Sequence, residues 1–86
     1  MGKTHPDTLM TMYNMANTYH VGLKDFTKAD EMYRQALDGY EKSLGKQHDD
    51  TKNCARNLAI LLAEGIKDKE KIRELIKSYP LSLIHI

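Results

Sequence analysis

The side chains best suited to chemistry in this chain are one cysteine, Cys54, and four histidines, His5, His20, His48 and His85. A cysteine nucleophile needs a base, a third group that orients the base, and an oxyanion donor, and the sequence identifies no such set around Cys54. No two histidines have the short spacing that places two metal ligands on one turn of a helix. We therefore predict no enzymatic activity, no metal and no other cofactor, and we expect the histidines to pack or cap loops.

Composition limits the size of the domain and the class of partner. With 86 residues the chain is one small domain or part of a larger one. Thirteen basic and twelve acidic side chains give a net charge of +1, so nucleic acid is not an expected partner. A single cysteine fits a reducing compartment, and no apolar run approaches the roughly 20 residues that span a bilayer. We expect a cytoplasmic protein with no membrane contact and no readable targeting signal.

An internal repeat dominates the organisation of the chain. The heptapeptide at residues 2–8 returns in similar form at residues 45–51, forty-three positions later. The same offset continues past it and pairs Asn14 with Asn57, Ala16 with Ala59 and Gly22 with Gly65, among others. A constant offset over this span predicts one structural unit used twice.

Each unit has the pattern of two helices, and no segment alternates like a strand. The first helix is predicted to begin near Pro6 and to stop near Val21, where Gly22 supplies a left-handed residue. The second helix is predicted after an N-cap at Asp25 or Thr27 and ends at Gly45. In the second unit Gly65 and Pro80 are the predicted stop signals. The fold class is therefore all-α.

Apolar side chains at three-and-four spacing predict the buried faces of the four helices. In the first unit these residues are Leu9, Met12, Met15, Ala16 and Tyr19, followed by Phe26, Ala29, Tyr33, Ala36, Leu37, Tyr40 and Leu44. In the second unit they are Ala55, Leu58, Ala59 and Leu62, followed by Ile72, Leu75, Ile76 and Tyr79. A helical hairpin keeps an uncovered apolar side until a neighbour stacks on it, so we expect a piece of a longer array.

Several segments resemble a known family. These are His-Pro-Asp-Thr at residues 5–8, Asn-Met-Ala at 14–16, Lys-Ala-Asp-Glu-Met-Tyr-Arg-Gln-Ala-Leu at 28–37 and Tyr-Glu-Lys-Ser-Leu-Gly at 40–45. Together they are similar to the tetratricopeptide repeats of kinesin light chains, over residues 2–65. The resemblance implies helical hairpins stacked as a short right-handed α-solenoid. It also implies one extra residue in the turn at residues 22–26, which we expect the loop to absorb.

The domain boundaries follow from the repeat. We predict one hairpin over residues 1–44 and a second, degenerate or C-terminal hairpin over residues 45–80. The second unit departs from the family pattern at Asp49, Lys52 and Ile72. Residues 81–86 are mostly apolar, follow Pro80 and match the translated end of a common sequencing adapter, so we expect a non-native tail. The alternative is a natural apolar tail that docks on the last helix.

The resemblance also implies a scaffold or adaptor function, with protein or peptide bound on the concave face formed by the first helix of each hairpin. In the family an asparagine just before the Leu-Ala pair lies on that face, and Asn14 and Asn57 match it. A side-chain amide both donates and accepts, so it can pair with the backbone of an extended peptide of any sequence. The residues expected on this face are Met10, Tyr13, Asn14, Asn17, His20, Asn53, Arg56, Asn57 and Ile60.

Two alternatives remain open at this point. The asparagines could instead bond across to the adjacent hairpin, which would make them structural. The whole chain could likewise be a structural or capping segment of a longer array, with no ligand of its own. Its exposed repeat ends could also support self-association.

Overall fold

The computed structural model describes residues 6–79, which form helices joined by short loops and contain no strand. The helices are α1 (Pro6–Asn17), η1 (Thr18–Gly22), α2 (Phe26–Leu44), α3 (Asp49–Ile60), η2 (Leu61–Ile66) and α4 (Lys69–Ser78). The predicted all-α class and the hairpin pattern are confirmed. The predictions for His5, His85, Pro80 and the tail at 81–86 lie outside the described residues.

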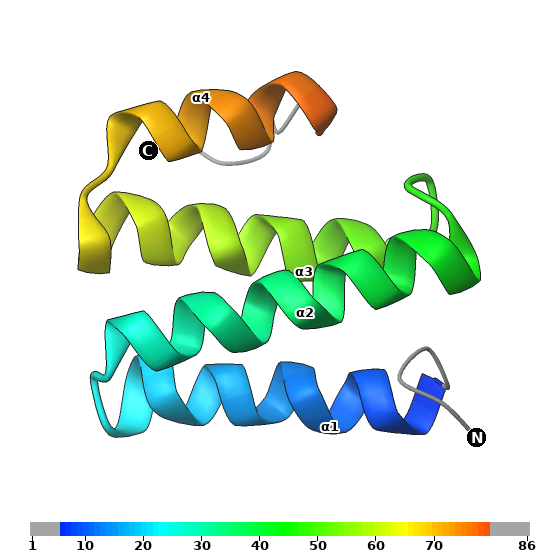
Figure 1. The fold of residues 1–86 in the computed structure, drawn as a ribbon, viewed down its shortest axis with the longest axis horizontal. Coiled ribbons are helices and arrows are strands. Elements are labelled where there is room, and N and C mark those ends of the chain that lie inside the picture. Colours follow the sequence, from blue (N-terminus) through cyan, green and yellow to red (C-terminus); the bar gives the residue numbers. More distant parts are fainter. Residues whose placement is uncertain (1–5, 80–86) are drawn as a thin grey trace.

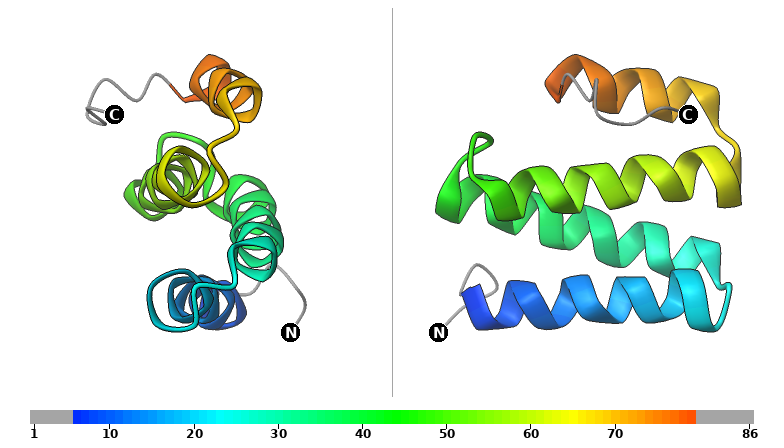
Figure 2. Two further views of the ribbon diagram at one scale, coloured as in Figure 1. Left: turned by 90° about the vertical axis from the view of Figure 1, so that its left-hand side faces the viewer. Right: turned by 180° about the vertical axis from the view of Figure 1, so that it is seen from behind.

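The helices form two antiparallel hairpins that stack in order (Figure 1). In the end-on view, α1 and α3 lie on one side and α2 and α4 on the other, so the first helices of the two hairpins share one face (Figure 2). Helix α2 packs against both α1 and α3, which makes it the centre of the molecule. The face shared by α1 and α3 is the one on which the sequence places the candidate binding residues.

Side-chain caps begin three of the helices. The Asp25 carboxylate accepts a hydrogen bond from the Lys28 N–H at the start of α2, and Asp68 accepts one from the Lys71 N–H at the start of α4. The ring of His48 accepts one from the Asp50 N–H at the start of α3, at 3.1 Å. These bonds satisfy backbone donors that have no partner within the helix. They confirm Asp25 as an N-cap and give His48 the predicted capping role.

Both first helices end in a wider π-helical turn, η1 and η2, at equivalent positions of the two units. The left-handed residues that follow are Lys24, with φ of 55°, and Lys67, with φ of 59°. The prediction that Gly22 is the left-handed residue is therefore wrong. Gly65 does not end its helix either, because η2 continues to Ile66. A π-turn bonds residues five apart instead of four, so it can hold an extra residue without lengthening the loop.

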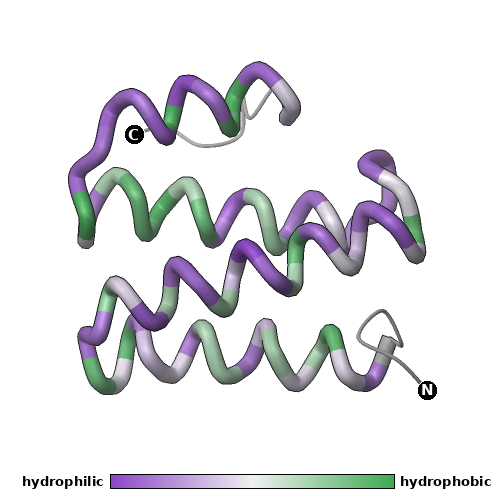
Figure 3. The backbone as a smooth tube through the Cα atoms, in the orientation of Figure 1, coloured by the Kyte–Doolittle hydropathy of each residue, from purple (hydrophilic) through white to green (hydrophobic). Residues whose placement is uncertain are grey.

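The core follows most of the predicted faces. Leu9, Ala16, Ala29, Tyr33, Ala36, Leu58 and Leu62 are almost fully buried, and Leu61 and Cys54 join them. The end of α3 and the beginning of η2, residues 58–63, form a continuous hydrophobic run (Figure 3). Met15 and Ile76, both predicted in the core, are 42% and 43% exposed instead. Met15 lies on the side of α1 that none of the described helices covers.

Close contact between α1 and α2 depends on a glycine in the second helix. A Cβ atom added at Gly39 would lie 2.2 Å from Cδ2 of Leu9, which is fully buried. The Leu9 side chain therefore occupies the space that any larger residue at position 39 would need. In the described part of the chain, no helix is both long and apolar enough to cross a membrane.

Candidate functional site

A pocket of about 230 Å³ opens between α1 and α3, and we call it the groove pocket. Helix α1 contributes Met10, Tyr13 and Asn14, helix α3 contributes Asp50 and Asn53, and Tyr40 of α2 also lines it. Four of these six residues are among those that the sequence assigns to the concave face. Met10 is 55% exposed, and Asn14 and Asn53 are exposed as well, so their side chains are available to a ligand.

A row of hydrogen bonds joins the groove side of the helices. The Asn57 amide donates to the Tyr13 hydroxyl, which ties α3 to α1. The Tyr33 hydroxyl donates to the Asn17 amide oxygen, and the His20 ring lies 3.4 Å from the same hydroxyl. Burial and the neighbouring Tyr13 raise the pKa of Tyr33 above its usual range. Asn57 and Asn17 are thus held by other side chains.

The two asparagines at equivalent positions therefore differ in their surroundings. Asn14 is exposed, and its side-chain amide has no hydrogen bond to any of residues 6–79. Asn57 is half-buried and already bonded to Tyr13. Asn14 can meet a ligand directly, whereas Asn57 would first have to release Tyr13.

A second pocket, of about 300 Å³, lies among η1, the loop that follows it, the start of α2 and η2. It is lined by His20, Val21, Lys24, Phe26, Glu64 and Gly65. A Cβ atom at Gly65 would come within 2.8 Å of the Phe26 ring, so this glycine allows η2 to approach the start of α2. Of the predicted groove residues, His20 alone lines this second pocket.

Arg56 and Ile60 complete the predicted set. Arg56 is exposed and makes no ion pair with any other described residue, and Ile60 is partly buried. Neither residue lines the groove pocket or the second pocket. Of the nine predicted residues, four therefore line the groove pocket, His20 lines the second pocket, and the remaining four line neither.

The sequence did not identify Tyr40 and Asp50 as site residues. Tyr40 has the spacing of a core residue, and it is 5% exposed, so periodicity alone assigns it to the interior. Asp50 is in the first turn of α3, where an acidic residue is sufficiently explained by the helix dipole. The sequence feature that could have identified Asp50 is its position three residues before Asn53, because residues three apart share a face of a helix.

The surroundings of Cys54 make its thiol unreactive. Its side chain is fully buried, and Sγ lies 3.5 Å from the Tyr33 carbonyl oxygen. Burial, and secondly the charge of Glu41, raise the pKa of this thiol from its ordinary 9.0 to about 12. A reactive cysteine needs an exposed thiolate. The site therefore offers binding groups and no activated nucleophile at Cys54.

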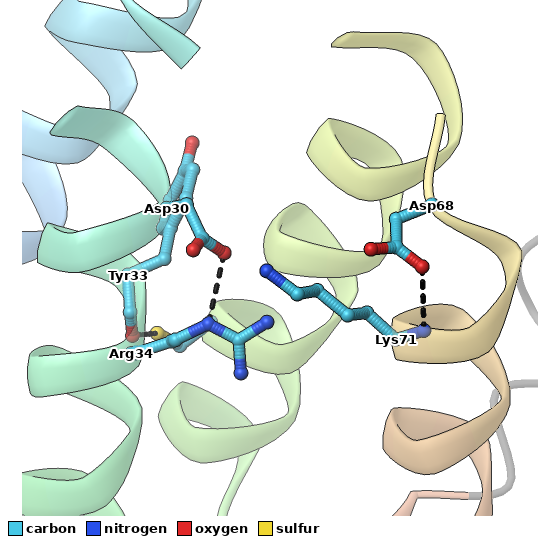
Figure 4. Close-up of polar contacts among 6 residues, drawn as sticks. Asp30, Tyr33, Arg34, Asp68 and Lys71 are labelled. Atoms are coloured by element: carbon cyan, nitrogen blue, oxygen red, sulfur yellow. Dashed lines mark hydrogen bonds and ion pairs between the residues drawn. The ribbon is translucent and has the colours of Figure 1, made fainter. Parts of the chain in front are cut away.

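A third cavity, of about 370 Å³, lies among α2, α3 and α4. Leu37, Leu58, Leu62 and Leu75 give it an apolar lining, and charged side chains including Arg34 and Lys71 accompany them. Arg34 pairs with Asp30 at 2.9 Å, and the Lys71 side chain extends from α4 toward α2 (Figure 4). This cavity marks the looser packing of α4 and contains none of the predicted groove residues.

Comparison with known proteins gives one match. The family model described as "Tetratricopeptide repeat" matches residues 7–78, which include both hairpins. Neither the curated proteins nor the solved structures contain a match to this chain.

Proposed function

We propose, because the chain belongs to the tetratricopeptide repeat family, that it is an interaction module without enzymatic activity which binds an extended peptide or partner protein between α1 and α3. Repeats of this family are in general protein–protein interaction modules. The observation that carries the proposal is the groove pocket, where Asn14 and Asn53 present free amides beside the apolar surface of Met10 and Tyr13. Such amides can pair with a peptide backbone, while the neighbouring pocket accepts a side chain.

The finer parts of the proposal are supported by the sequence. The segments at residues 5–8, 14–16, 28–37 and 40–45 favour the kinesin light chain-like type of repeat, with hairpins at 1–44 and 45–80. A net charge of +1 favours a protein partner over nucleic acid. A single reduced cysteine in the core favours the cytoplasm.

The first prediction tests the groove through Asn14. Peptides are selected from a random-sequence phage library on the immobilised chain, and their affinities are measured by calorimetry. Asn14→Ala should lower the affinity for the selected peptides about tenfold, because the substitution removes hydrogen bonds to the peptide backbone. Its melting temperature should not fall, because this amide has no partner among the described residues and alanine is the better helix former.

Gln35→Ala is the matched control. Gln35 is also an exposed amide on a helix, but helical spacing places it on the side of α2 opposite Tyr40. This variant should bind as the parent chain does. Equal affinity of Asn14→Ala and the parent would contradict the groove proposal. Asn57→Ala is unsuitable as a clean test, since it breaks the bond to Tyr13 and should lower stability.

A second candidate function, a structural segment of a longer array, is favoured by one face of α1. The five residues Thr8, Thr11, Met15, Thr18 and Gly22 are all exposed, and we call them the α1 stripe. Their equivalents forty-three positions later are Thr51, Cys54, Leu58, Leu61 and Gly65. The first four of these are no more than 1% exposed, and they lie on the helix that packs against α2.

The α1 stripe is therefore suited to the same contact. The Thr11 and Thr18 hydroxyls each donate to a carbonyl one turn earlier in the chain, so covering these two residues would leave neither hydroxyl unpaired. A helix like α2, from another hairpin of a longer chain or from a second copy, would fit this face. Such stacking is compatible with ligand binding in the groove, because the groove pocket contains none of the stripe residues.

A further inference from the structure

The groove pocket has a distinctive electrostatic character. Of the six described residues that line it, Asp50 is the one with a formal charge at neutral pH. The others supply two phenol rings, two amides and a thioether. A pocket with a carboxylate, aromatic walls and hydrogen-bond acceptors is complementary to a cation that has an apolar stem.

The Asp50 carboxylate has no cation as its partner among the described residues. Its nearest candidate is His48, whose Nδ1 lies 3.9 Å from Oδ2. That nitrogen accepts a hydrogen bond from the Asp50 N–H, which is the role of a neutral imidazole nitrogen and not of a cation. No lysine or arginine of residues 6–79 lies within ion-pair distance of Asp50. The pocket therefore presents an uncompensated negative charge.

The field of this carboxylate reaches the interior of the pocket. Burial, and then the charge of Asp50, raise the pKa of Tyr40 above its ordinary value of 10.0. This direction shows that the Asp50 carboxylate disfavours a second negative charge at Tyr40, so the field inside the pocket is negative and favours a cation. Asn14 and Asn53 add amide oxygens that accept hydrogen bonds, and neither side chain is bonded to another described residue.

We propose that the groove pocket is a socket for an arginine side chain, with the Asp50 carboxylate as its counter-charge. This proposal rests on the peptide-binding function proposed above and names the side chain that the peptide inserts. The guanidinium group is planar, stacks on aromatic rings and donates in several directions, which suits acceptors on two helices better than a lysine ammonium does. At about 230 Å³ the pocket is smaller than ordinary small-molecule sites, so it fits one side chain.

The test is an NMR titration of the full chain with the amide of N-acetylarginine. The comparison ligand is the amide of N-acetylcitrulline, which has nearly the same shape and no charge. Arginine should shift the amide signals of Met10, Asn14, Asp50 and Asn53, and citrulline should bind about tenfold more weakly. Equal binding of the two would overturn the proposal. Lysine amide that binds as tightly as arginine amide would overturn the choice of guanidinium.

Two variants separate the pocket charge from general effects. Asp50→Asn should weaken the binding of N-acetylarginine amide about tenfold, because this substitution removes the counter-charge and keeps the shape of the side chain. Asp49→Asn is the matched control, since Asp49 also lies in the first turn of α3, is exposed and does not line the pocket. It should bind arginine amide as the parent does. An equal loss in both variants would indicate a helix-end effect and overturn the proposal.

The phage selection distinguishes failure of this inference from failure of the proposed function. Enrichment of arginine among peptides that lose affinity with Asn14→Ala would support both. Peptides that depend on Asn14 but show no preference for arginine would overturn the arginine socket and leave the groove function in place. Arginine amide that binds at Asp50 while no peptide is selected would support the socket chemistry and contradict the peptide-binding function.

Discussion

At the scale of single residues, burial decides which polar side chains can act. Asn14 and Asn57 occupy equivalent positions, yet one is free and the other is bonded to Tyr13. Asp50 and Asp49 are neighbours in one helical turn, yet Asp50 alone lines the groove pocket. Cys54 is the clearest case, because burial removes the reactivity that its residue type would allow.

The Cys54 thiol should be strongly protected in the folded chain. A pKa of about 12 in place of 9.0 leaves about a thousandfold fewer thiolates at pH 8 than in the unfolded chain. Alkylation by iodoacetamide should therefore be at least that much slower than in denaturant, which mass spectrometry over time can measure. Because this pKa is raised on folding, the stability that the thiol contributes is complete below about pH 9 and is lost as the pH rises toward 12.

Cys54→Ala is the control for that pH dependence. Its free energy of unfolding should fall less than that of the parent between pH 9 and 12, because the ionising thiol is gone. The tyrosines with raised pKa, Tyr33, Tyr40 and Tyr79, remain in both chains. Similar alkylation rates in the native and the denatured parent would show that the thiol is accessible and would contradict this account.

At the scale of elements, the helices and their caps are set by residues that are close together in the sequence. The close contacts between helices are made by residues that are far apart in it. Helix α2 spans Phe26–Leu44 as the pattern predicted, because its cap at Asp25 and its stop at Gly45 are encoded beside it. The contact of Leu9 with Gly39 joins residues of two helices, and spacing within either one does not reveal it. The same is true of Gly65 against Phe26.

Gly39→Ala should destabilise the hairpin although alanine is the better helix former. The new methyl group would meet the buried Leu9 side chain, so the helices would have to separate or Leu9 would have to leave its position. We expect a net loss of about 1–2 kcal/mol in urea unfolding, since overpacking outweighs the gain in helix propensity. Gly22→Ala is the control, because its φ is not positive and its nearest atom is Thr18 Cγ2 at 3.9 Å. It should be neutral or slightly stabilising, and the same sign for both variants would contradict the Leu9 argument.

At the scale of the whole molecule, the helices of the two hairpins differ in how far their neighbours cover them. Helix α2 is covered by α1 and by α3, whereas the α1 stripe is exposed. In a repeat array stability is approximately a sum of hairpin and interface contributions, so each added interface should stabilise the hairpins that form it. The exposed stripe is therefore the place where an added hairpin should act.

A chain in which residues 2–44 are duplicated ahead of the first hairpin should test this. The added copy of α2 would cover the stripe as α2 covers α3, and the melting temperature measured by circular dichroism should rise. In the longer chain Met15→Glu should cost about 2 kcal/mol or more, because it would bury a charge, while in the present chain it should cost little.

Val21→Glu is the control for both chains. Val21 is exposed, and its equivalent in the second unit is the exposed Glu64. It should therefore be neutral with and without the added hairpin. A duplicated chain that melts no higher than the present one, or that tolerates Met15→Glu, would exclude the α1 stripe as a stacking face.

The sequence by itself determined the helices, the ends of α2 and most of the core, because the spacing of Ala29, Tyr33 and Ala36 along one helix is a local property. The resemblance to tetratricopeptide repeats implied that the first helices of the two hairpins share a face, and the structure places α1 and α3 on one side (Figure 2). Only the tertiary structure decided that Met15 is exposed while its equivalent Leu58 is buried, since that depends on whether a neighbouring helix is present. The groove pocket likewise arises where Tyr13, Tyr40 and Asp50 meet from three helices, and no periodicity within one helix records how three helices pack together.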